Sequence, residues 1–171
     1  MPLKIADVLL LDFDKEIENT RRTLERIPDN PDWKPHAKSM PMGRLSMHCA
    51  TISLFGHYVL EDPDMDLAAP RHPHFPLEWK GRDAALAALD DSAQKCRASL
   101  VSASDEHLMV EWPFTWGEQT IFKGPRALAF RTMCFDHMIH HVAQLGVYLR
   151  LLELPVPALY GPSADEQFAM K

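Results

Sequence analysis

The sequence lacks the features of membrane-spanning, secreted and disulfide-stabilised proteins. No apolar run approaches the roughly 20 residues of a transmembrane helix, and the N-terminus shows no basic region followed by an apolar segment and a cleavage site. The 171 residues include only three cysteines, Cys49, Cys96 and Cys134, with no CxxC pair. Such cysteines argue against a disulfide framework and against an all-cysteine zinc site. We therefore expect a cytoplasmic protein with no membrane partner.

Several catalytic and nucleotide-binding motifs are also missing. The absence of HExxH excludes a zincin protease, and no GxSxG marks a serine nucleophile. Neither GxGxxG nor the P-loop pattern is present. The net charge of −6 has no basic run to offset it, which argues against nucleic acid as the main partner. The chain is 46% hydrophobic, enough for one core, so we expect a single domain over residues 1–171.

Apolar residues recur at helical spacing in four long segments, residues 5–27, 39–60, 82–104 and 125–152. Ser39 is expected to cap the second segment. Over residues 107–122 the period changes to two, which predicts a short β-hairpin turning near Gly117. Pro113 should make its first strand an edge or bulged strand. The predicted fold is all-α: a four-helix bundle with long crossing loops and a small β-hairpin between the third and fourth helices.

The fourth helical segment carries three histidines within five residues. At about 100° per residue, His137 and His141 lie one turn apart in the middle of its apolar stripe, whereas His140 lies at the edge. Cys134 belongs to the same stripe. A histidine pair at positions i and i+4 is the local geometry of a metal-binding helix. The pair requires a third ligand from elsewhere.

The second helical segment offers that ligand. His48 lies at the centre of its apolar face, and His57 lies on the opposite, solvent side. Three neutral imidazoles that converge between helices suit Zn²⁺, Ni²⁺ or Fe²⁺ and leave a position for water or substrate. The alternative is three unrelated core histidines, but their burial without a metal would cost several kcal/mol of desolvation. We therefore predict a divalent transition metal bound by His48, His137 and His141.

The sequence also offers residues that could surround this metal. Gln144, Tyr148 and Asp136 are candidates to hydrogen-bond the ligating imidazoles. Cys134, one turn before His137, is an alternative fourth ligand, although it would close a site whose use needs an open position. The C-terminal tail could also reach the metal.

Two further groups of residues receive a structural interpretation. His72 and His74 lie in a proline-rich connection and are interpreted as exposed loop residues. Trp112, Phe114 and Trp116 could line the mouth of the site, but packing beneath the hairpin is the favoured role.

Four stretches of the chain match a known family in order: TRRTLERIP, DWKPHAKSMPMGRLSMH, HMIHHVAQLGVYLRLLELPVP and YGPSADE. In these stretches the chain resembles the DinB-like family of four-helix-bundle proteins. The resemblance implies a divalent metal held by one histidine of the second helix and an HxxxH pair of the fourth, which fall on His48, His137 and His141. Val142 and Ala143 stand where relatives often carry Arg-Gly, so the groups around the ligands are expected to differ.

Some members of that family are thiol-dependent transferases or isomerases that use bacillithiol or mycothiol. The resemblance and the open three-ligand site predict that the protein acts on a small molecule, with a low-molecular-weight thiol as one candidate. A homodimer is the expected assembly. The expected activity is metal-dependent thiol transfer or hydrolysis. The alternative is a non-catalytic metal-binding module for stress response or sensing. No general base stands beside the histidines in the sequence, so no catalytic residue is assigned.

Two expectations concern charge. The acidic net charge favours a small uncharged or cationic electrophile as the substrate, although local charge at the mouth of the site could override the net charge. With an unperturbed histidine pKa near 6.5, protons should compete with the metal at about pH 5 to 6.

Overall fold

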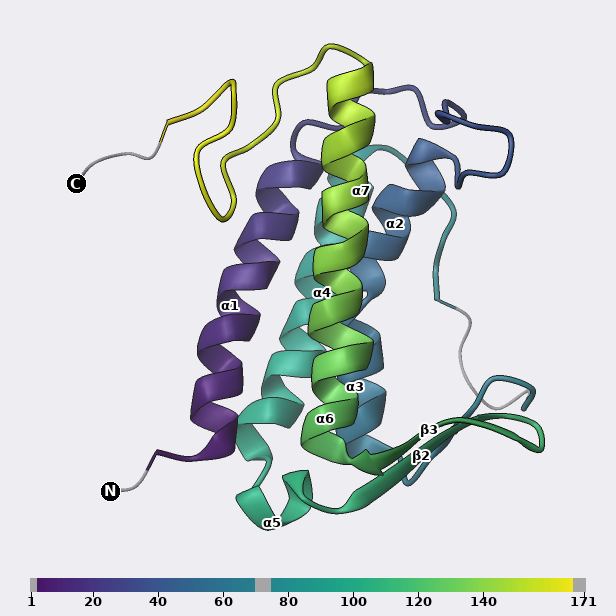
Figure 1. The fold of residues 1–171 in the computed structure, drawn as a ribbon, viewed down its shortest axis with the longest axis vertical. Helices are drawn as coiled ribbons and strands as arrows, with labels where there is room; N and C mark the ends of the chain where they lie inside the picture. The colour runs from purple at the N-terminus through teal and green to yellow at the C-terminus, as the bar shows by residue number, and fades with distance from the viewer. Residues whose placement is uncertain (1–2, 70–74, 168–171) are drawn as a thin grey trace.

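The computed structural model describes residues 3–69 and 75–167. This part of the chain is mostly helical, with a small three-stranded sheet at one end (Figure 1). None of its helices is long and apolar enough to cross a membrane. The long helical segments run side by side around a common apolar core. Their elements are α1 (Ile5–Leu24), α2 (Met42–Thr51), α3 (Ser53–Glu61), α4 (Arg82–Ser102), α6 (Arg126–Phe130), the π-helical η1 (Arg131–Asp136) and α7 (His137–Leu151).

The second predicted segment is helical but divided at Ile52. Ile52 keeps helical backbone angles (φ −57°, ψ −34°), so α3 continues the course of α2. The Thr51 hydroxyl donates to a carbonyl one turn earlier at 2.9 Å, a bond that competes with the regular backbone pattern. The prediction of a Ser39 cap is wrong, because α2 begins at Met42 after Pro41, which makes no side-chain cap.

The fourth predicted segment contains a π-helical stretch that a regular helical wheel does not describe. The six residues of η1 stand immediately before His137, and π-helical hydrogen bonding from i to i+5 widens the turn. Cys134 lies in this stretch and is fully buried. A Cβ atom on Gly56 would lie 2.7 Å from Sγ of Cys96 and 3.1 Å from Sγ of Cys134. The glycine therefore permits a close approach of α3, α4 and η1.

The predicted hairpin is present, and it belongs to a larger sheet. Its strands are β2 (Glu111–Trp116) and the antiparallel β3 (Gln119–Pro125). The turn uses Gly117 at φ +56°, a conformation that glycine adopts readily. The unpredicted β1 (Met65–Asp66) pairs in parallel with Phe114 and Thr115. β2 is therefore the middle strand and not an edge, but it is irregular between these two residues, in line with the predicted bulge.

The first residues of the predicted hairpin form a helical turn instead of a strand. α5 (Asp105–Leu108) begins after Ser104, whose hydroxyl accepts the backbone N–H of His107 at 3.2 Å. An N-cap serine followed by acidic residues in the first turn stabilises a helix start. The alternating pattern therefore begins only at Glu111.

The aromatic residues of β2 have unequal environments. Trp112 is fully buried and Phe114 nearly so, as the packing interpretation predicted. Trp116, near the turn, is 61% exposed, so the same interpretation is wrong for this residue. His72 and His74 lie outside the described residues.

The C-terminal tail, residues 152–167, has no regular structure and runs back beside α1 and α7 (Figure 1). The Glu166 carboxylate accepts a hydrogen bond from Arg22 at 2.8 Å and forms an ion pair with Arg26. Asp165 forms an ion pair with Arg150 at the end of α7. These contacts hold the tail against α1 and α7.

Candidate metal centre

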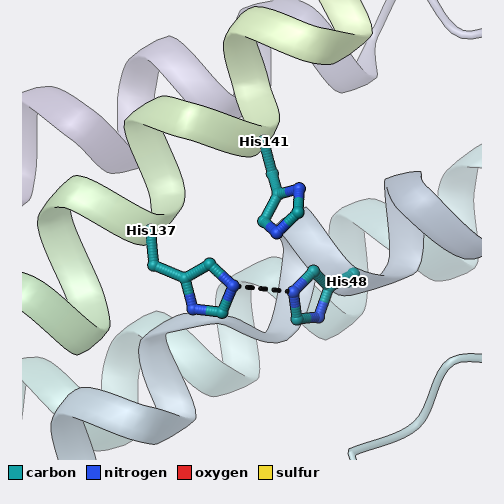
Figure 2. Close-up of side chains that lie close together, drawn as sticks. All are labelled: His48, His137 and His141. Carbon is teal, nitrogen blue, oxygen red and sulfur yellow. Dashed lines mark hydrogen bonds between the residues drawn. The ribbon is translucent and has the colours of Figure 1, made fainter. Parts of the chain in front are cut away.

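Three histidines meet between α2 and α7 (Figure 2). Nε2 of His48 lies 3.1 Å from Nε2 of His137. The His141 ring centroid lies 4.6 Å from that of His48 and 4.8 Å from that of His137. One nitrogen of each ring lies within 4.8 Å of the other two. In the part of the chain that the structure describes, no other group of three or more His, Cys, Asp or Glu residues meets this spacing.

The local helix geometry explains this convergence. His137 and His141 are one turn apart in α7, so their rings lie next to each other on one face, tilted by 52°. Leu145, a turn further along, is fully buried, and Leu45 is fully buried before His48 in α2. Both leucines belong to the common apolar core, which α2 and α7 share. The histidines are themselves half-buried, so they lie at the edge of the core, and not at its centre as the helical wheels predicted.

Burial keeps the three rings neutral. Desolvation lowers the pKa of His48 from 6.5 to about 3, with further lowering by the charges of His137, His141 and Arg44. Burial likewise lowers the pKa of His137 to about 4, and it lowers the pKa of His141. Neutral imidazole is the form that binds metals. At neutral pH each ring therefore has a lone pair to offer.

Gln144 determines which nitrogen of His141 faces the cluster. Its Oε1 lies 2.8 Å from Nδ1 of His141, so Nδ1 carries the proton and Nε2 keeps its lone pair. Its Nε2 lies 3.0 Å from Nε2 of the exposed His140, to which it donates. Outer hydrogen bonds of this kind fix the tautomer and orientation of metal-binding histidines. The contact expected of Gln144 is thus present.

The other two candidates for this role have different partners. The Tyr148 hydroxyl donates to the backbone carbonyl of Met40 at 3.0 Å. Asp136 is exposed at the end of η1 and lies 3.9 Å from Arg131 in an ion pair. The predictions that Tyr148 and Asp136 bond the cluster are therefore wrong.

Two further sequence-based placements are corrected. The Cys134 sulfur lies near that of Cys96 in the core and is not part of the histidine cluster, because η1 departs from the α-helical wheel. His57 is half-buried and not on the solvent side, since its Nδ1 lies 2.8 Å from Oγ of Ser99 on α4. No tail residue among those described belongs to the histidine cluster.

An aromatic surface beside the histidines was missed by sequence reasoning. The Phe55 ring centroid lies 5.7 Å from that of His137. Phe75, from the connection before α4, stacks on Phe55 with 4.3 Å between centroids. Nothing in the local sequence pattern marks Phe75, because its position depends on how the connection folds back over α3.

The donor set fits a divalent metal. Two nitrogens on one tetrahedral zinc ion are about 3.3 Å apart, given Zn–N bonds of about 2.0–2.1 Å. The 3.1 Å between His48 and His137 is close to this separation. Three protein ligands leave at least one coordination position for another group. The arrangement therefore suits an open metal site.

Fold and site together define a mostly helical protein with a histidine cluster held between two helices. The family model of the DinB superfamily matches residues 12–145, and the chain belongs to that superfamily, as the resemblance predicted. No curated protein sequence matches the chain.

Two crystal structures share the fold. A DinB-like protein from Bacillus subtilis has a TM-score of 0.65 at 20% identity, covering 92% of this chain and 97% of its own. A DinB-like protein from Bacillus cereus has a TM-score of 0.64 at 18% identity, covering 88% of this chain and 95% of its own. At such identities the similarity concerns the fold alone.

Proposed function

We propose that the protein binds one divalent transition metal, Zn²⁺, Ni²⁺ or Fe²⁺, through His48, His137 and His141. The observation that carries the proposal is the convergence of three imidazole nitrogens within 4.8 Å of one another. The low pKa values of His48 and His137 support it, because both rings are neutral at pH 7. Membership of the DinB superfamily is compatible with such a site.

The activity that we propose for this site is metal-dependent thiol transfer to, or hydrolysis of, a small molecule. When bound, the ion would lower the pKa of a thiol or a water molecule at the open coordination position. The chain itself contributes binding and orientation. Gln144 holds the His141 ring. Phe75, which is partly buried and stacks on the buried Phe55 beside His137, offers an apolar surface.

The second candidate is a non-catalytic metal-binding module for stress response or sensing. One observation favours it: among the described residues, the histidine cluster includes no carboxylate that could act as a general base. A protein that only holds or senses a metal needs no such base.

We further propose that residues 1–171 form one four-helix-bundle domain that acts as a cytoplasmic homodimer. The side-by-side course of the long helical segments and their common core support the bundle (Figure 1). Exposed apolar side chains on α1 and α7, such as Leu11 and Val147, support a dimer.

The experiment is a titration of Co²⁺-substituted protein with low-molecular-weight thiols. Thiol binding at the open position should produce a sulfur-to-metal charge-transfer band, which His137→Ala should abolish and His57→Ala should retain. If no thiol changes the spectrum while water remains bound, the hydrolase is favoured. If protein atoms fill the coordination sphere, both activities are excluded and a structural or sensing role remains.

A further inference from the structure

The two segments that carry the histidines contain no acidic residues. Residues 33–60 and 137–152 have no Asp or Glu, although the whole chain has 24 among 171 residues. At that frequency the 44 residues of these segments would contain about six. The same segments do contain cations, namely Lys34, Lys38, Arg44 and Arg150. Taken by themselves, the two segments therefore carry a positive net charge, opposite in sign to the net charge of −6 for the whole chain.

Arg44 is the cation closest to the cluster along α2. It precedes His48 by four residues, which places it on the same helix face about 6 Å along the axis. Arg44 is exposed and forms no hydrogen bond or ion pair with any described residue. Its guanidinium, which has no partner among residues 3–69 and 75–167, is thus available to a ligand of the metal centre.

We infer that the ligand of this site carries a carboxylate that Arg44 binds, in addition to the atom that joins the metal. The inference rests on the proposed metal site. Three neutral imidazoles leave both positive charges of a divalent ion uncompensated, so an anionic ligand is favoured there. A guanidinium binds a carboxylate through two parallel hydrogen bonds.

The sequence-based expectation of an uncharged or cationic electrophile does not extend to the ligand that joins the metal. That expectation used the net charge, but a bound ligand responds to the nearest charges, because solvent and salt screen distant ones.

The positions of Arg44 and the aromatic side chains relative to His48 predict how the ligand is oriented. Phe55 follows His48 by seven residues, two turns further along the same helical course, whereas Arg44 precedes it by one turn. The anionic end of the ligand should therefore point toward Arg44. An apolar portion would lie against the partly buried Phe75, which stacks on the buried Phe55 beside His137.

The test compares three small thiols that differ in the charge of their second group. These are 3-mercaptopropionate, 2-mercaptoethanol and 2-aminoethanethiol, titrated into the Co²⁺-loaded protein with the charge-transfer band as the readout. We expect 3-mercaptopropionate to bind about tenfold more tightly than 2-mercaptoethanol, as one hydrogen bond between charged groups provides. The thiols also differ in acidity, which affects their binding to the metal. The decisive quantity is therefore the change, between the unaltered protein and a variant, in the affinity ratio of 3-mercaptopropionate to 2-mercaptoethanol.

Arg44→Gln should reduce the preference for 3-mercaptopropionate about tenfold and leave the binding of 2-mercaptoethanol unchanged. Arg44→Lys should keep part of the preference for 3-mercaptopropionate. Lysine keeps the positive charge but cannot donate the two parallel hydrogen bonds of a guanidinium. Arg97→Gln is the matched control, since Arg97 is an exposed arginine of α4 that pairs with Asp14. It should change none of the affinities.

The inference is overturned if Arg44→Gln leaves the affinity ratio of 3-mercaptopropionate to 2-mercaptoethanol unchanged, or if it weakens the binding of all three thiols equally. The proposed metal site is unaffected by either outcome. If no thiol produces a band, thiol transfer fails, and glycolate is compared with ethylene glycol through the Co²⁺ ligand-field spectrum. Insensitivity of glycolate binding to Arg44→Gln then overturns the inference. The metal content is measured before the titrations. If the protein binds no metal, both the proposed function and the inference are wrong.

Discussion

The Nε2 atoms of His48 and His137 lie 3.1 Å apart, although 89 residues separate the two positions in the chain. A hydrogen bond between two neutral rings requires that one Nε2 carries a proton. A metal ion bound by both nitrogens would require this proton to move to Nδ1 of the same ring. Tautomer exchange of this kind needs no net protonation, so a neutral pair at this separation is well suited to receive an ion.

Purified protein should contain about one divalent metal ion per chain. His48→Ala, His137→Ala and His141→Ala should each lose most of it, because each removes one of three proposed donors. Elemental analysis of the purified variants measures this directly. Full metal retention in all three variants would exclude the site.

Two other histidines serve as controls for this measurement. His140→Ala should keep the ion, because His140 is exposed and contacts the cluster only through Gln144 and the His141 ring. His57→Ala should also keep it. Because His57 hydrogen-bonds Ser99, its removal should lower the free energy of unfolding by about 1 kcal/mol, a change that urea unfolding would detect.

Gln144→Leu should weaken metal binding by about 10- to 100-fold, as is typical when the outer hydrogen bond of a metal ligand is lost. The variant removes the acceptor of His141 Nδ1–H with little change in side-chain volume. Competition with a chromophoric chelator gives the affinity. Gln144→Glu retains an acceptor and should bind more tightly than Gln144→Leu. Equal affinities for Gln144→Leu and the unaltered protein would show that this contact does not support the ligand.

The three clustered histidines could be selected from the sequence because α2 and α7 are regular around them. His48, His137 and His141 lie in helices that follow the usual wheel, so positions on one face could be read from spacing alone. Their family resemblance pointed to the same three positions. The spacing did not determine how deeply the three histidine side chains are buried, because their solvent exposure depends on how far apart α2 and α7 pack.

The errors lie where tertiary contacts or irregular backbone decide the structure. Cys134 was misplaced because η1 interrupts the α-helical period just before His137. The partner of His57 depends on the packing of α3 against α4. β1 has only two residues, too few for a pattern, and it forms because a distant strand is available to pair with it.

Metal should be retained to lower pH than an ordinary histidine pKa suggests. Burial lowers the pKa of His48 to about 3 and that of His137 to about 4. Protons should therefore compete with the metal only below about pH 5, and not at pH 5 to 6. Dialysis between pH 4 and 7, followed by elemental analysis and circular dichroism, tests this. Metal loss near pH 6 with helices intact would show that the rings titrate normally.

The stability of metal-free protein should fall as the pH decreases from about 6.5 to about 4. In this window the unfolded chain binds protons on His48 and His137, whereas the native rings, with lowered pKa values, do not. Urea unfolding at pH 7 and pH 5 measures the change. His48→Gln removes one of these rings, so its stability should depend less on pH. The same dependence in both proteins would contradict this assignment.

Gly56→Ala should destabilise the fold, because it places a methyl group where three helical elements meet. The Cβ atom would lie 2.7 Å from both Sγ of Cys96 and Cε2 of Phe130, closer than side-chain atoms normally pack. Overpacking of this kind costs about 1–3 kcal/mol, and the higher helix propensity of alanine offsets up to about 1 kcal/mol of it. The net change should appear in urea unfolding at constant metal content.

A matched glycine and a second-site change separate overpacking from a general effect of substitution. Gly146→Ala in α7 meets only Val156, at 3.7 Å, which is ordinary contact, so it should be neutral or stabilising by up to about 1 kcal/mol. Combining Gly56→Ala with Cys96→Ala removes the sulfur that the new methyl group meets. The double variant should therefore be more stable than the sum of the two single changes predicts, since residues in contact are not additive. If the two changes in the free energy of unfolding are strictly additive, the Cys96 side chain moves aside at no cost in free energy. The close approach of α3 and α4 would then not depend on Gly56.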